Sequence, residues 1–148
     1  MNSRVRTIVL IAALGMASLA SGSAMAGTGA PAAALGRHAW HTAIEVPGTA
    51  ALNQRGRAQI TSVSCAAAGN CGAGGFYKDS SGNFQAFVVS QVNGTWHTAI
   101  EVPGTPVLNQ GGSAEITSVS CAAAGTCSAG GQYTDSSGHS QAFVVSQT

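Results

Sequence analysis

The sequence contains two consecutive segments of 56 residues, 37–92 and 93–148, that align with each other without a gap. Of the 56 paired positions, 41 are identical, and Trp40 aligns with Trp96. Repeats of this length form supersecondary units that stack or are arranged radially, because one unit cannot bury its apolar face alone. The sequence therefore predicts two copies of one small structural unit, repeat 1 over 37–92 and repeat 2 over 93–148.

Residues 1–26 have the layout of a secretory signal peptide. Arg4 and Arg6 precede a mostly apolar run over 7–20, and small residues lead to the expected cleavage after Ala26. The alternative is an uncleaved membrane anchor, but a spanning helix needs about 20 apolar residues and this run is shorter. We expect residues 27–36 to form a flexible linker. The protein is predicted to be secreted and extracellular, with no membrane association once the leader is removed.

Each repeat is predicted to form four short antiparallel strands, which in repeat 1 span 40–46, 58–65, 71–78 and 84–91. After the leader the chain has ten Val and four Ile against three Leu, a bias that favours strands. Asn93–Gly94 is a hairpin signal between strands. The predicted fold class is all-β, with two four-stranded units that resemble β-propeller blades, and an eight-stranded β-sandwich is the alternative. The glycine-rich segments 72–75 and 128–131 favour blades, because strand glycines mark close backbone approach.

The four cysteines have the same spacing in both repeats, five residues between the members of each pair. This spacing predicts two disulfides, Cys65–Cys71 and Cys121–Cys127, with Cα separations of about 4.4–6.8 Å. Secretion would supply the oxidising compartment. A four-thiolate zinc site is the alternative, but it needs more closely spaced cysteine pairs. No metal site and no cofactor are therefore expected.

The composition excludes several functions. Six Lys and Arg against five Asp and Glu provide no cationic footprint, so we expect no binding of nucleic acid. The sequence contains neither a Gly-x-Ser-x-Gly nucleophile motif nor a phosphate-binding Gly-x-x-x-x-Gly-Lys loop. We therefore expect no catalytic residues and no enzyme activity. The alternative is an extracellular hydrolase-like propeller module, or a fragment of a longer repeat array.

Four aromatic residues are the candidate ligand-binding residues, because amphipathic aromatic rings are common on surfaces that bind sugars or protein partners. These residues are Trp40, Trp96, Tyr77 and Tyr133. The alternative is that they pack inside the blades. Arg55 and Arg57 differ between the repeats, so the fold cannot require them. The candidate partners are a glycan or an extracellular protein.

The strings SVSCAAAGNC at 62–71, DSSG at 79–82 and QAFVVS at 85–90 resemble the tandem repeats of secreted actinobacterial proteins, and the HAF-type extracellular repeat. The resemblance covers 40–148 and implies a propeller-like extracellular repeat protein with no general enzymatic role. The sequence departs from the HAF pattern in its cysteine pairs and at Gln85 and Gln141, where that repeat has His.

Two blades cannot close a propeller ring, which has about 4–8 blades. We therefore expect several chains to associate as a homo-oligomer that completes one ring. The alternative is a monomer in which two sheets pack face to face.

Overall fold

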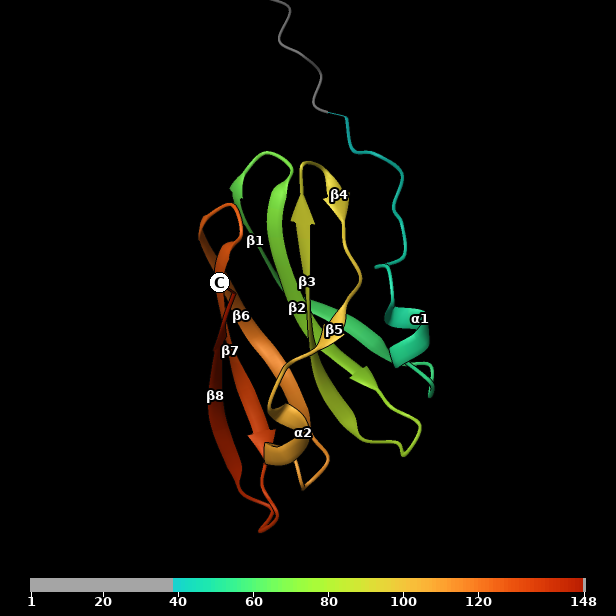
Figure 1. Cartoon of the computed structure of the whole chain (residues 1–148). Helices are drawn as coiled ribbons and strands as arrows, with labels where there is room; N and C mark the ends of the chain where they lie inside the picture. The colour runs from blue at the N-terminus through green and yellow to red at the C-terminus, as the bar shows by residue number, and fades with distance from the viewer. Residues whose placement is uncertain (1–38, 148) are drawn as a thin grey trace, which may run out of the picture. The chain divides into compact units, whose positions relative to one another are not determined.

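The computed structural model describes residues 39–147. The predicted leader (1–26) and linker (27–36) lie outside these residues, so both stay predictions. The elements in chain order are α1 (Thr49–Leu52), β1 (Ala58–Ala67), β2 (Asn70–Lys78), β3 (Phe84–Val92), β4 (Thr95–Trp96), β5 (Ile100–Glu101), α2 (Thr105–Leu108), β6 (Ala114–Ala123), β7 (Thr126–Thr134) and β8 (Ser140–Ser146) (Figure 1).

The strands form two antiparallel sheets, so the chain is all-β as predicted, and neither sheet closes into a barrel. Sheet A has the strand order β1-β2-β3-β4, with β5 also paired to β3, and sheet B has the order β6-β7-β8. The pairing of β6 with β7 and of β7 with β8 reproduces, 56 residues later, that of β1 with β2 and of β2 with β3. We use "counterpart" for the residue 56 positions away.

Sheet A extends beyond the end of the first 56-residue segment. After β3 the chain turns at Asn93 and Gly94, which both have positive φ, as a two-residue hairpin turn of this type requires. The following residues then pair with β3 as β4 and β5. The boundary between the sheets therefore lies after Glu101 and not at residue 92.

The predicted strand over 40–46 is wrong, because these residues have no regular secondary structure. Their counterparts at 96–102 form β4 and β5 only because β3 lies beside them. Within the described residues no strand lies beside 40–46, so repeat 1 has three of its four predicted strands. In repeat 2 the first predicted strand forms in two parts, β4 and β5, which pair with sheet A. Sheet B accordingly has three strands.

Two single-turn helices, α1 and α2, precede β1 and β6. Each follows a glycine in the left-handed conformation, Gly48 at φ 87° and Gly104 at φ 89°. The hydroxyls of the next residues, Thr49 and Thr105, each donate a hydrogen bond of 2.7 Å to the carbonyl three residues earlier. These bonds fix the chain direction before β1 and before β6.

Each sheet has two faces, because side chains alternate along a strand. The tyrosine face is defined by Ala73, Tyr77, Phe87 and Val89 in sheet A and by Ala129, Tyr133, Phe143 and Val145 in sheet B. The glycine face is defined by Gly72, Gly74, Ala86 and Val88 in sheet A and by Ser128, Gly130, Ala142 and Val144 in sheet B.

The two sheets stack, with the tyrosine face of sheet B on the glycine face of sheet A. Ala86 from sheet A and Ile116 from β6 are both 0% exposed and belong to one buried cluster with Ala129. Hydrogen bonds also join the two sheets, since the backbone N–H groups of Val119 and Cys121 on β6 donate to serine hydroxyls on β1. The tyrosine face of sheet A is covered instead by residues around 46–52 and 96–99.

The stack requires glycine on β2, as the glycine-rich segments predicted. A Cβ atom at Gly74 would lie 2.9 Å from Cγ2 of Ile116, and one at Gly72 would lie 3.0 Å from Sγ of Cys127. At Gly130, the counterpart of Gly74, the nearest atom would be 3.7 Å away and comes from β8 of the same sheet. The glycine face of sheet B is therefore open where that of sheet A is filled.

We expect Gly74→Ala to lower the free energy of unfolding by about 1–3 kcal/mol, because overpacking would force Ile116 out of its site. Gly130→Ala is the matched control, and it should change the free energy by no more than about 0.5 kcal/mol. Urea unfolding of dilute protein, followed by circular dichroism, measures both. Equal losses in the two variants would contradict the stacking described above.

Candidate strand-addition site

The outer edge of β3 is occupied by residues 95–102, which we call the edge segment. Val88 is paired with Ile100 and Gln91 with Trp96. On either side of Val88, the N–H of His97 donates to the Ser90 carbonyl at 2.9 Å, and the N–H of Val102 donates to the Ala86 carbonyl at 3.0 Å. The edge segment thus completes sheet A by backbone hydrogen bonds.

Side chains of the edge segment also seal the tyrosine face of sheet A. Trp96 is half-buried against a cluster that includes Ala99, Tyr77 and Phe87, and Tyr77 and Ala99 are each 3% exposed. Burial raises the pKa of the Tyr77 hydroxyl, and the negative charge of Glu101 and a hydrogen bond to that carboxylate raise it further. The edge segment therefore contributes both an aromatic anchor and a polar contact.

The sequence at 141–147, which covers β8 from Gln141 onward and the residue after it, is identical to that of β3 from Gln85 to Gln91. Among the described residues, however, β8 pairs only with β7. The N–H of Gln147 donates to Cys127 in sheet B, so the backbone groups of Val144 and Ser146 point to the open edge. Val144 is 87% exposed, whereas its counterpart Val88 is half-buried.

An apolar pocket of about 220 Å³ adjoins this open edge, between the two sheets. Val88 and Ile100 line it from sheet A, and Ala129 and Val145 line it from sheet B. Ala73 and Val89, the counterparts of the sheet B pair, belong to the cluster against which Trp96 packs in sheet A. The pocket thus has the same position beside sheet B that the Trp96 side chain has beside sheet A.

The four candidate ligand-binding aromatics do not form one surface. Trp40 is 100% exposed, and Trp96 and Tyr77 contribute to the same core cluster. Tyr133 is half-buried, with its ring centroid 6.4 Å from that of Phe143. Tyr77 lies on the central strand β2 and belongs to the cluster against which Trp96 packs, and Tyr133 occupies the equivalent position on β7. In the part of the chain that the structure describes, no strand pairs with Trp40.

Neither the open edge of β8 nor the pocket beside it was predicted from the sequence. Two repeated strings are the signal from which both could have been predicted: 85–91 recurs at 141–147, and 41–48 recurs at 97–104. In sheet A the first copy of one string pairs with the second copy of the other.

Arg57 packs on two phenylalanines at the stacked face. Its guanidinium carbon lies 5.3 Å from the Phe84 ring centre and 5.9 Å from that of Phe76. Arg55 lies nearby and donates to the Ser80 carbonyl at 3.0 Å. The counterparts of Phe76 and Phe84 are Gln132 and Ser140, so the arginine pair accompanies the aromatic pair.

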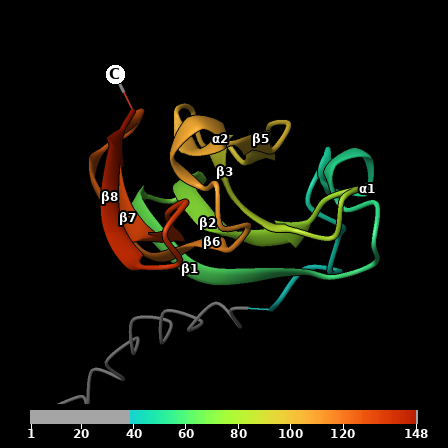
Figure 2. The same cartoon turned by 90° about the horizontal axis from the view of Figure 1, so that it is seen from below.

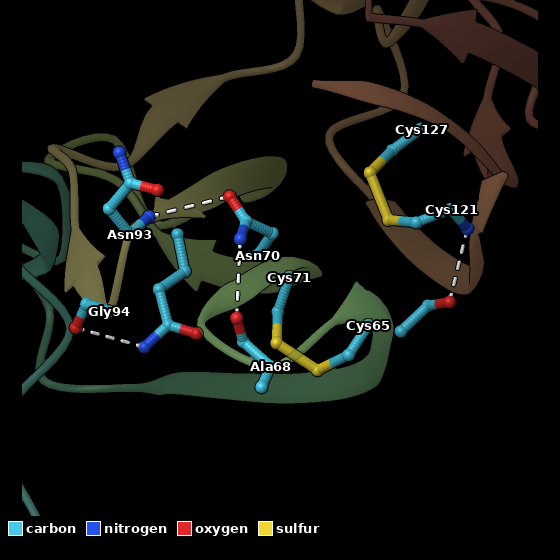
Figure 3. Close-up of a disulfide and its surroundings, with 10 residues drawn as sticks. Cys65, Ala68, Asn70, Cys71, Asn93, Gly94, Cys121 and Cys127 are labelled. Carbon is cyan, nitrogen blue, oxygen red and sulfur yellow. Dashed lines mark hydrogen bonds between the residues drawn. A yellow bond between two sulfur atoms is a disulfide. The ribbon is translucent and has the colours of Figure 1, made fainter. Parts of the chain in front are cut away.

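The two predicted disulfides, Cys65–Cys71 and Cys121–Cys127, are present (Figure 3). Their Cα separations, 3.9 and 4.0 Å, are shorter than predicted, because each pair is directly opposed across strands beside a tight hairpin. Disulfides persist in oxidising compartments, which is the setting these bonds indicate.

The two DSSG turns are held by their aspartates. Desolvation raises the pKa of Asp79, but hydrogen bonds from the Gln85 side chain and from backbone N–H groups of the turn outweigh it and lower the pKa overall. The bond from Gln85 measures 3.0 Å. Hydrogen bonds from Gln141 and from the His139 backbone likewise lower the pKa of Asp135. Gln85 and Gln141, which depart from the HAF pattern, thus have a structural role.

Between residues 39 and 147 no three His, Cys, Asp or Glu side chains are grouped to hold a metal ion. In the same part of the chain, no helix has the length and apolar character needed to cross a membrane. Comparison with protein-family models, curated proteins and solved structures gives no significant match. The resemblance to the HAF-type repeat therefore stays a prediction.

We expect Trp96→Ala to lower the free energy of unfolding by about 2–3 kcal/mol, because it removes an aromatic ring from the core of sheet A. Trp40→Ala, the matched variant at the counterpart, should change it by no more than about 0.5 kcal/mol. Both values come from urea unfolding of dilute protein. A large loss for Trp40→Ala would show that its side chain packs within the monomer.

Proposed function

We propose that the protein is a secreted, extracellular repeat protein with a binding role, and that it binds extended protein segments along the open edge of β8. One observation carries this proposal: the sequence QAFVVSQ occurs at 85–91 in β3 and again at 141–147 along β8. Among residues 39–147 the edge of β3 is paired with a strand, whereas that of β8 is open. Binding by strand addition uses backbone hydrogen bonds for affinity and side-chain pockets for specificity.

The edge segment shows what a ligand of β8 would look like. It would be an extended chain that pairs with Val144 as Ile100 pairs with Val88. An aromatic residue four positions before that isoleucine counterpart would reach the apolar pocket beside Ala129 and Val145. An acidic residue directly after it would meet Tyr133, as Glu101 meets Tyr77.

A protein ligand is favoured over a glycan. Sugar sites commonly present several exposed aromatic rings. Of the four candidate aromatics only Trp40 is exposed, whereas Tyr77 is buried and Trp96 and Tyr133 are half-buried. The pocket beside β8 is lined mainly by aliphatic side chains, and the neighbouring edge offers backbone donors and acceptors in a row. An extended peptide satisfies both features at once.

We expect a fluorescent peptide with the sequence of residues 95–102, TWHTAIEV, to bind the purified oxidised protein saturably, as measured by fluorescence anisotropy. Val144→Pro should weaken binding at least about tenfold, or about 1.4 kcal/mol, because proline removes an N–H that faces the open edge. The sheet itself should tolerate this proline, since it lies on an edge strand.

Val144→Ala keeps that N–H and is the matched protein control, and a peptide carrying Ile100→Pro is the matched ligand control. A peptide that does not bind, or that binds Val144→Pro protein equally well, would contradict the proposal. A glycan array provides the competing outcome: an oligosaccharide that the peptide displaces would identify a carbohydrate-binding site instead.

A further inference from the structure

We infer that the segment received by β8 is residues 40–46 of a second copy of this chain. This inference rests on the proposed function and names the partner. Residues 41–48 are identical to 97–104, which include most of the segment that pairs with β3. In sheet A, β3 is paired with the edge segment. The same two sequences occur again as β8 and as residues 40–46, and within the described residues neither of these is paired with the other or with another edge strand.

The register of the contact between copies follows from the pairing of β3 with the edge segment in sheet A. Gln147 would pair with Trp40 as Gln91 pairs with Trp96, and Val144 would pair with Ile44. The N–H of His41 would donate to the Ser146 carbonyl, as that of His97 donates to Ser90. The residue types at 40–46 and 141–147 are the same as those at 96–102 and 85–91 in sheet A.

The exposed apolar side chains fit the same contact. Trp40, Val63 and Val144 are 100%, 55% and 87% exposed, whereas the counterparts of all three are half-buried. Val63 lies on the tyrosine face of sheet A, opposite Ala73, whereas Val144 lies on the glycine face of sheet B, opposite Gly130. In the pairing register, the Trp40 ring enters the pocket beside Val145, the place equivalent to that of Trp96.

Polar groups at the two ends are complementary as well. The side-chain amide of Asn109 donates to the Phe84 carbonyl and to Gln85, each at 2.9 Å, and so joins α2 to β3. Its counterpart Asn53 is positioned to donate to Gln141 of another copy. The serines of β6, at positions 118 and 120, are likewise counterparts of the β1 serines that accept hydrogen bonds from the next sheet.

The segment cannot reach β8 of its own chain in this arrangement. In both views β8 and α1, which follows the segment directly, lie at opposite sides of the stacked sheets (Figures 1 and 2). Sheet A lies between them. The contact is therefore head-to-tail, and such contacts generate a ring when the rotation closes and an open array when it does not. A closed ring would be the propeller predicted from the sequence.

Position 128 is expected to make the contact between two copies weaker than the packing of sheet B on sheet A within one chain. Gly72, which faces the Cys121–Cys127 disulfide, has Ser128 as its counterpart. The Cβ of Ser128 would approach the Cys65–Cys71 disulfide of the next copy as closely as a Cβ at Gly72 would approach its own neighbour, 3.0 Å. Association is therefore expected to be weaker than the packing between sheets A and B.

Sedimentation velocity across the micromolar range tests the inference on the purified oxidised chain. We expect association, with Trp40→Ala and Gly130→Ala each raising the dissociation constant at least about tenfold, a difference of about 1.4 kcal/mol. Gly130→Ala acts because its Cβ would meet Ile60 of the next copy, as one at Gly74 would meet Ile116. Ser128→Gly should strengthen association, because it restores the residue found at position 72.

Val107→Ala is the matched control. Val107 is 77% exposed but lies in α2, outside the contact, and alanine is the residue found at its counterpart. Circular dichroism verifies that each variant is folded. In a Trp96→Phe protein, Trp40 is the only tryptophan, and its emission should shift to shorter wavelength as the protein associates.

A protein that stays monomeric throughout this range, or one that associates equally well after Trp40→Ala and Gly130→Ala, overturns the inference. The peptide experiment separates it from the proposed function. Trp40→Ala protein that binds TWHTAIEV, while the unsubstituted protein stays monomeric, would retain strand addition with a different partner. Loss of both peptide binding and association would remove both proposals.

Discussion

The close approach of Ile116 to the bare backbone at Gly74 is the contact on which the rest of the structure depends. With no side chain at positions 72 and 74, the second sheet can lie directly on the first, and Ala86 and Ile116 are excluded from water. Ala86 and Ile116 belong to the buried cluster through which the two sheets pack on each other.

The two outer faces of the stacked sheets differ in exposure. The tyrosine face of sheet A is covered by residues near its own N-terminal turn and by the edge segment, whereas the glycine face of sheet B remains exposed. Gln132 and Ser140 in place of Phe76 and Phe84 make that exposed face more polar than its counterpart. A more polar face and an open strand edge at β8 therefore occur together in sheet B, within the described residues.

Local chemistry accounts for what could be predicted from the sequence. The strands β1, β2 and β3, the disulfide pairing and the Asn93–Gly94 turn follow from alternation, spacing and turn preference, which act over a few residues. The alternation at 40–46 shows that this segment can form a strand, but it does not show whether a neighbouring strand exists. Trp40 and Trp96 are the clearest case: they precede identical sequences, and only the position of β3 makes one exposed and the other part of a core.

The two-residue turn between β3 and the edge segment makes the filling of that edge independent of protein concentration. A link this short holds the edge segment near β3 at an effective concentration of about millimolar or more, so that edge is filled as soon as the sheet forms. In the proposed contact between copies, the same sequence at 40–46 would reach β8 only by diffusion, at the bulk concentration of the protein. The edge of β3 is therefore filled at any protein concentration, whereas the edge of β8 would be filled only to the extent that the protein concentration allows.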